Sequence, residues 1–162
     1  MMRYELVQLM RYDTCDNPIE LDDYSSGSYA VYRANNNSRM KFIYFMPDEK
    51  RLTEPRCDYV LTNVTFPDTS SRFIELKGKD VPRQKRCCKT EWDHAFHQLV
   101  CTYREFVSYL NLPDEKVVFV LCTSIEKKRI AARYRNYKWY KELRENISSE
   151  LLILYKGDID TV

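Results

Sequence analysis

Three ionisable side chains on two neighbouring apolar runs have the types and spacing of a hydrolytic metal site. Glu75 and Lys77 are separated by one residue in the run 72–77, so in a β-strand both side chains leave the same face. Asp58 lies in the preceding run, 57–62, and antiparallel pairing of the two runs would bring its carboxylate alongside Glu75. We therefore expect two carboxylates and one ammonium group to converge where the second run ends.

This combination of side chains suits Mg²⁺, which takes near-octahedral oxygen ligands and keeps several of its waters. The carboxylates of Asp58 and Glu75 and the backbone carbonyl of Leu76 would hold the ion, and Mn²⁺ accepts the same kind of donor. A bound divalent ion lowers the pKa of its water and neutralises charge on a phosphodiester. Lys77 would orient that water and stabilise the charge that builds on the phosphorus oxygens. The predicted reaction is hydrolysis of a nucleic-acid backbone.

The elements that must position these residues alternate between strands and helices. Apolar, β-rich runs that end at proline, glycine or polar turns predict strands, and helical spacing of apolar residues predicts two long helices. The predicted strands are 40–46, 57–62, 72–77, 117–122 and 151–155, and the predicted helices are 91–110 and 126–146. This order predicts an α/β fold with a central mixed β-sheet flanked by helices. These predicted elements follow an N-terminal segment, in which residues 1–11 could form a helix.

Length and composition limit the alternatives. The chain has 162 residues, a mass of 19.5 kDa and 44% hydrophobic residues, which predicts a single domain over 1–162. Only three glycines argue against a glycine-rich phosphate-binding loop. No apolar run reaches the length of a membrane span and the start lacks a signal-peptide pattern, so we expect a cytoplasmic protein with no membrane partner. The six cysteines form no C-x-x-C pair and predict buried reduced thiols, with no role assigned to the adjacent Cys87 and Cys88.

The placement of Asp58 on one strand and Glu75-x-Lys77 on the next resembles the restriction-endonuclease-like, or PD-(D/E)xK, nuclease superfamily. The resemblance implies a single-domain restriction-endonuclease-like fold, with a core of a helix, three strands, a helix and another strand. That core would cover about residues 1–122, and the basic helix and last strand would follow at 126–157.

The resemblance also extends to the predicted helix after the motif. Many members of the superfamily have a glutamine there, and Gln98 takes that position in this chain. The resemblance implies that Gln98 supports the site by hydrogen bonds and that Asp58, Glu75 and Lys77 are catalytic. The exonuclease branch has Q-x-x-x-Y at this point, whereas here Thr102 stands where the tyrosine is expected.

The pattern [DE]-x-K occurs four times in the chain, so the residues around each copy must show which copy belongs to a site. The other three copies lie in polar segments, at 48–50, 114–116 and 126–128. Only Glu75 and Lys77 interrupt an apolar strand, where charges are costly unless they are paired or bound to a metal. The alternative is a surface-facing Glu-Lys pair on an edge hairpin, with Asp58 capping a turn.

A strongly basic predicted helix is the best candidate for a nucleic-acid surface. Residues 126–144 hold eight basic and two acidic side chains, a local balance of +6 in a chain with a net charge of +2. The side chains expected to contact phosphates are Lys128, Arg129, Arg133, Arg135 and Lys138. Aromatic side chains between them could stack on bases. An amphipathic helix with its aromatic residues in the core and a solvated basic face is the alternative.

These observations together predict a Mg²⁺-dependent nuclease, with DNA favoured over RNA as its nucleic-acid partner. A partner subunit that selects the substrate is a further possibility, since 162 residues leave little room for a separate recognition domain. The resemblance also implies a possible homodimer, because small nucleases of this type often work as dimers. The alternative is a non-catalytic module that keeps the nuclease fold and binds nucleic acid or a protein.

Overall fold

The structure is a computed structural model that describes the chain in segments. The described residues are 12–14, 18–22, 30–37, 42–47, 55–63, 71–77, 85–110, 116–124, 132–147 and 150–162. The helix predicted over 1–11 lies outside them. None of the helices within these segments is long and apolar enough to cross a membrane.

The described segments form two helices and two mixed β-sheets, which confirms the predicted α/β class. The larger sheet contains β1 (Tyr12–Thr14), β4 (Phe42–Phe45), β5 (Tyr59–Asn63), β6 (Ser71–Lys77), β7 (Val117–Thr123) and β8 (Glu150–Leu154). The smaller sheet contains β2 (Ile19–Asp22), β3 (Val31–Asn35) and β9 (Asp160–Thr161). The helices are α2 (Lys85–Leu110) and α3 (Lys138–Asn146), preceded by a short 3₁₀ helix, η3 (Ala132–Asn136).

The larger sheet has the order β1-β4-β5-β6-β7-β8. Its first four strands are successively antiparallel, and β7 and β8 then run parallel to β6. Tyr59 pairs with Ile74, so the antiparallel pairing predicted between the runs 57–62 and 72–77 is confirmed. The sheet places β6 between β5 and β7, in its interior. Every strand predicted from apolar runs therefore lies in this one sheet.

The smaller sheet was not predicted from the sequence. Its strands β2 and β3 pair antiparallel, and the two-residue β9 adds to β3 in parallel. Buried and exposed residues alternate along β3, as expected for a strand with one covered face. The strand β9 is only two residues long and pairs with β3 across most of the chain length, so no local pattern in the sequence indicates it.

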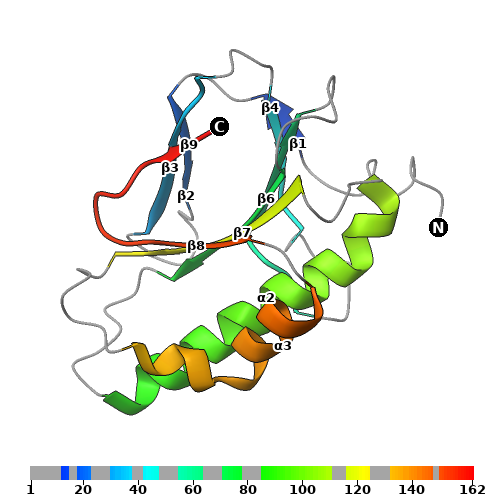
Figure 1. The fold of residues 1–162 in the computed structure, drawn as a ribbon. Coiled ribbons are helices and arrows are strands. Elements are labelled where there is room, and N and C mark those ends of the chain that lie inside the picture. The colour runs from blue at the N-terminus through cyan, green and yellow to red at the C-terminus, as the bar shows by residue number, and fades with distance from the viewer. Residues whose placement is uncertain are drawn as a thin grey trace.

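The two sheets and the helices form three layers (Figure 1). The helices α2 and α3 cover one face of the larger sheet, and the smaller sheet covers the other. Phe73 packs with Phe96 and Leu99 of α2 in the core on the helix side. Ile74 packs with Tyr32 of β3 in the core between the sheets. Consecutive residues of β6 therefore point into two different cores, and both faces of the strand are buried.

The single helix predicted over 126–146 is wrong, because the chain changes direction at Tyr137. This residue has extended dihedral angles (φ −73°, ψ 142°) and divides η3 from α3. Its own side chain makes no capping hydrogen bond. Instead, the carboxylate of Asp93 on α2 accepts a hydrogen bond from the backbone N–H of Trp139 at 3.1 Å. An acceptor from another helix thus satisfies an orphan donor in the first turn of α3.

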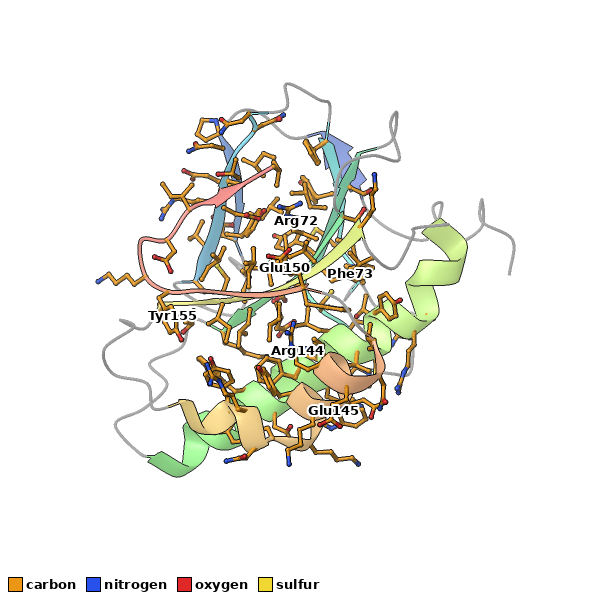
Figure 2. All side chains as sticks on the ribbon, in the orientation of Figure 1. Arg72, Phe73, Arg144, Glu145, Glu150 and Tyr155 are labelled. Atoms are coloured by element: carbon orange, nitrogen blue, oxygen red, sulfur yellow. The ribbon has the colours of Figure 1, made fainter. Side chains whose placement is uncertain are left out.

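A buried ion pair joins the two sheets. The Arg72 side chain on β6 donates to Asp160 Oδ2 on β9 at 3.0 Å, and Tyr32 on β3 donates to the same oxygen at 2.7 Å. Only 10% of the Arg72 side chain and 7% of the Asp160 side chain is exposed. Arg72 lies between the sheets (Figure 2), where a second hydrogen bond reaches the Thr161 carbonyl at 3.1 Å. The short β9 is therefore held by charge as well as by its backbone pairing.

We expect Asp160→Asn to lower the free energy of unfolding by about 3–5 kcal/mol, because it removes the carboxylate charge that pairs with the buried Arg72 side chain. Urea denaturation followed by circular dichroism measures the change. Glu20→Gln is the matched control, since it removes the carboxylate of the exposed Arg33–Glu20 pair and should cost less than about 1 kcal/mol. Equal losses in the two variants would contradict a stabilising role for the buried pair.

The described cysteines have free thiols in different environments. Cys57 and Cys122 are buried and Cys101 is partly buried, in agreement with the predicted reduced thiols. The side chains of Cys15, Cys87 and Cys88 lie outside the described part of the structure. Burial, followed by the charge of Asp158, raises the pKa of Cys122 to about 12.

We therefore expect thiol reagents at mildly alkaline pH to modify Cys101 well before Cys122. A raised pKa keeps the thiol protonated, and the thiolate is the reactive form. Iodoacetamide labelling followed by peptide mass spectrometry measures each site, with the unfolded chain in urea as the control in which both should react alike. Equal rates in the folded protein would contradict the described burial of Cys122.

Candidate active site

The residues predicted for the site lie where β6 faces α2. Glu75 has 2% of its side chain exposed and Lys77 has 19%. Because β6 is flanked by β5 and β7 in the sheet, Glu75 is a buried carboxylate in an interior strand and Lys77, at the end of that strand, is partly buried. The alternative of a surface pair on an edge hairpin is thereby excluded for Glu75 and Lys77.

The ammonium group of Lys77 is held between two side chains. Its Nζ lies 2.6 Å from Glu75 Oε1 and donates to Gln98 Oε1 at 3.0 Å. Gln98 Nε2 in turn donates to the backbone carbonyl of Arg56 at 2.8 Å. The two ends of the Gln98 amide therefore connect β6 with the chain that enters β5. The structure brings Gln98 to the predicted Glu75–Lys77 pair.

Asp58 lies just beyond the end of the backbone pairing between β5 and β6. Its Oδ2 accepts a hydrogen bond from the Leu76 N–H at 2.7 Å. The register that pairs Tyr59 with Ile74, continued by one residue, places Asp58 opposite Glu75. In an extended strand the N–H and C=O of one residue point to the same edge, so the Leu76 carbonyl also faces the Asp58 side.

Both carboxylates affect the pKa of the Cys57 thiol. Its pKa is raised first by complete burial, then by the negative charge of Glu75, with a smaller contribution from Asp58. A hydrogen bond with Thr102 opposes these effects. The charges of Glu75 and Asp58 both raise the pKa of the same thiol, so the two carboxylates lie in the same part of the protein.

Two residues that sequence analysis did not select position the site. Thr102 Oγ1 accepts a hydrogen bond from the Cys57 N–H at 2.9 Å and donates to the Gln98 carbonyl at 2.7 Å. The buried side chain of Arg56 forms an ion pair with the partly exposed Glu105, which lies on α2 like Thr102. These contacts hold the residues just before β5 against α2. The spacing of Gln98 and Thr102 was visible in the sequence, but the bond to Cys57 joins residues that are far apart in the chain.

His94 lies one helical turn before Gln98 and is exposed. Neighbouring protein atoms still remove part of its hydration, and this loss, followed by the Lys77 charge, lowers the pKa of His94, while Asp93 acts in the opposite direction. His97, on the next turn of α2, stacks on Trp139 of α3 with ring centroids 3.9 Å apart and an angle of 12° between the planes. His97 therefore has a packing role between the two helices.

The donor set fits a hard divalent cation. The carboxylates of Asp58 and Glu75 and the backbone carbonyl of Leu76 are all oxygen donors, as Mg²⁺ and Mn²⁺ require. Among the described side chains no three His, Cys, Asp or Glu residues gather as a metal site. Any ion at this position would consequently depend on the backbone carbonyl and on water for the remaining ligands.

The predicted nucleic-acid contacts are only partly described. Arg135 and Lys138 are exposed, whereas Lys128 and Arg129 lie outside the described residues and the Arg133 side chain is not described. The aromatic rings of η3 and α3 pack against the helix-side core; they belong to Tyr134, Tyr137, Trp139 and Tyr140. The arrangement of the rings matches the amphipathic alternative, with the exposed basic side chains on the outer face.

Comparisons with protein-family models, curated proteins and solved structures found no match to this chain. The assignment of a function therefore depends on the residues and geometry of the site itself.

We expect Gln98→Ala to lower the free energy of unfolding by about 1–3 kcal/mol, because it removes partners from Lys77 and from a carbonyl in a largely buried site. Thermal and urea denaturation measure the loss. His94→Ala is the control on the same helix, and its exposed side chain should cost no more than about 0.5 kcal/mol. If the two variants were equally stable, Gln98 would not be holding the site.

Proposed function

We propose that the protein is a Mg²⁺-dependent nuclease with a restriction-endonuclease-like fold, which hydrolyses phosphodiester bonds and prefers DNA. The observation that carries this proposal is the ion pair between the buried Glu75 and the partly buried Lys77, held by Gln98, with Asp58 across from it at the end of the β5–β6 pairing. Charged groups in an interior strand are costly, and clustered carboxylates beside a lysine are typical of sites with a chemical task.

The order of elements supports the fold assignment. Strands β4, β5 and β6 are followed by α2 and then by β7, which is the order of the superfamily core after its first helix. Asp58 directly precedes β5, the second of the three strands, the Glu-x-Lys pair is on the third and Gln98 is on the helix that follows. The position of that first helix corresponds to residues outside the described part of the chain.

In the proposed mechanism, Asp58, Glu75 and the Leu76 carbonyl would hold the metal ion. When bound, Mg²⁺ supplies charge neutralisation at the phosphodiester and a more acidic water. Lys77 would donate a hydrogen bond to the attacking water or to a phosphoryl oxygen as negative charge builds there. Gln98 keeps the ammonium group in position, because its Oε1 accepts from Lys77 while its amide is anchored on Arg56.

The substrate class is supported by the charge of the helix layer. Exposed basic side chains on and before α3 could neutralise phosphates of a nucleic acid; they are Arg135, Lys138, Lys141 and Arg144. The resemblance favours DNA over RNA. A cytoplasmic location is part of the proposal, and the free thiols of Cys57 and Cys122 agree with a reducing compartment.

We expect Glu75→Gln and Lys77→Met each to reduce cleavage by about 10²–10³-fold, because each removes one charged group that acts at the reacting phosphate. The measurement is the cleavage rate on single-stranded, duplex and branched DNA and on RNA, with Mg²⁺ or Mn²⁺ and with EDTA. Glu20→Gln, a change at an exposed carboxylate of the smaller sheet, is the control and should retain full activity. Cleavage that survives both site substitutions would refute the assignment.

A non-catalytic binding module is the second candidate, and one observation favours it. Lys77 already neutralises Glu75, and Asp58 already accepts a backbone hydrogen bond, so both carboxylates have a structural use. Calorimetric titration with Mg²⁺ separates the candidates. Heat that disappears in Glu75→Gln supports the metal site, whereas nucleic-acid binding without any Mg²⁺ heat or cleavage favours the module.

A further inference from the structure

A row of rings leads from the candidate active site to the basic helix α3. The ring centroids of His94 and His97 on α2 lie 6.3 Å apart, and His97 stacks on Trp139 of α3 with centroids 3.9 Å apart. The Lys138 ammonium group lies 4.9 Å from the centroid of the Trp139 ring. Because α3 lies beside α2 on the same face of the larger sheet (Figure 1), this row of rings connects the two helices.

His94 is the end of this row at the candidate active site. Side chains of an α-helix lean towards its N-terminus, so the Gln98 amide reaches back over the turn that carries His94. The Lys77 ammonium group donates to that amide at 3.0 Å, and its charge acts on the His94 ring. His94 is exposed, and 19% of the Lys77 side chain is exposed. The two side chains therefore lie close together where the site meets solvent.

At neutral pH the His94 ring offers a flat surface and not a charge. Partial loss of hydration and then the Lys77 charge lower its pKa from the ordinary value of 6.5, and Asp93 opposes them. The ring is therefore largely neutral, and it does not neutralise phosphates. Flat rings, histidine included, stack on the bases of unpaired nucleic acid. Bases inside a duplex already stack on one another, so the ring can receive only an unpaired base.

We propose that His94 stacks on an unpaired base next to the phosphodiester bond that is cleaved, so that the substrate is an unpaired DNA strand. This inference rests on the proposed nuclease function and names the substrate class of that site. From His94 the strand would continue over the row of rings to α3, where the exposed Arg135 and Lys138 could neutralise its phosphates. His94 would determine specificity without taking part in the bond-breaking step.

Binding in EDTA tests the stacking contact without cleavage. The two ligands are a short fluorescent strand of thymidines and a strand of the same length without bases, and fluorescence anisotropy gives each dissociation constant. His94→Ala should weaken binding of the thymidine strand by about tenfold and leave the base-free strand unchanged. His94→Phe should bind like the unsubstituted protein, because it keeps a flat ring and removes the titrating group. Circular dichroism verifies the fold of each variant.

Lys138→Gln tests the direction in which the strand leaves the site. It should weaken both strands equally and reduce the slope of log affinity against log salt by about 0.7, because a phosphate contact does not depend on the base. Arg33→Gln is the matched control and should change neither ligand. It removes an exposed positive charge from the smaller sheet, which covers the other face of the larger sheet (Figure 1). An unchanged slope in Lys138→Gln would overturn the continuation over α3.

Four results would overturn the stacking contact or the substrate class. The first is equal affinity of His94→Ala and the unsubstituted protein for the thymidine strand. The second is an equal loss on the base-free strand, because His94 would then contact a phosphate. The third is an equal loss in His94→Phe, because the contact would then be a hydrogen bond. The fourth is tighter binding of a duplex than of the thymidine strand.

Failure of the proposed nuclease function would give a different result. Suppose the binding pattern in EDTA is the expected one, but no strand is cleaved with Mg²⁺ or Mn²⁺. The nuclease would then be refuted, and His94 would stand as a contact of a binding module. If instead the protein cleaves single-stranded and duplex DNA, and His94→Ala keeps the ratio of the two rates, the nuclease would stand and the role of His94 would be refuted.

Discussion

The arrangement of the whole protein depends on β6, a strand that is buried on both faces and still carries three charged side chains. Arg72 points to the smaller sheet, while Glu75 and Lys77 point to α2. A charge removed from water must find a partner within the protein. Arg72 and Lys77 therefore each connect β6 to another element, β9 and α2 respectively.

The two charged clusters act on opposite layers. Arg72 binds Asp160, and this pairing draws the C-terminal strand β9 into the smaller sheet. The Glu75–Lys77 pair binds Gln98, which connects α2 to the start of β5. A buried ion pair adds little net stability compared with apolar residues of the same size. The clusters are better understood as devices that fix geometry, which a reactive site requires.

The parts of the fold that sequence analysis predicted are those with a strong local pattern. The unbroken apolar run of β7 and the paired runs of β5 and β6 have the expected place and direction. The structure also brings Gln98 to Lys77, and Gln98 had been selected through the resemblance. Of the smaller sheet, the two-residue β9 was missed because it pairs with β3 across most of the chain, and no local pattern carries such a contact.

The same reasoning accounts for the break between η3 and α3. The helical spacing of apolar residues continues through Tyr137, so this spacing predicts one helix. The capping acceptor Asp93 belongs to a different helix, and only the folded chain shows it. Arg56 and Thr102 escaped selection for the same reason, since their roles are to hold Gln98 and Cys57 by hydrogen bonds over long sequence separations.

The location of the candidate site follows from unequal strand lengths. The backbone pairing of β6 with β5 ends at Ile74, but its pairing with β7 continues to Lys77. Over these last residues the side chain of Asp58 takes the place of a strand partner by accepting the Leu76 N–H. The end of β6 is therefore held by backbone pairing with β7 on one side and by the Asp58 carboxylate on the other. This keeps the Leu76 carbonyl near the carboxylates of Asp58 and Glu75. That is the arrangement from which an oxygen-ligated cation site can be built.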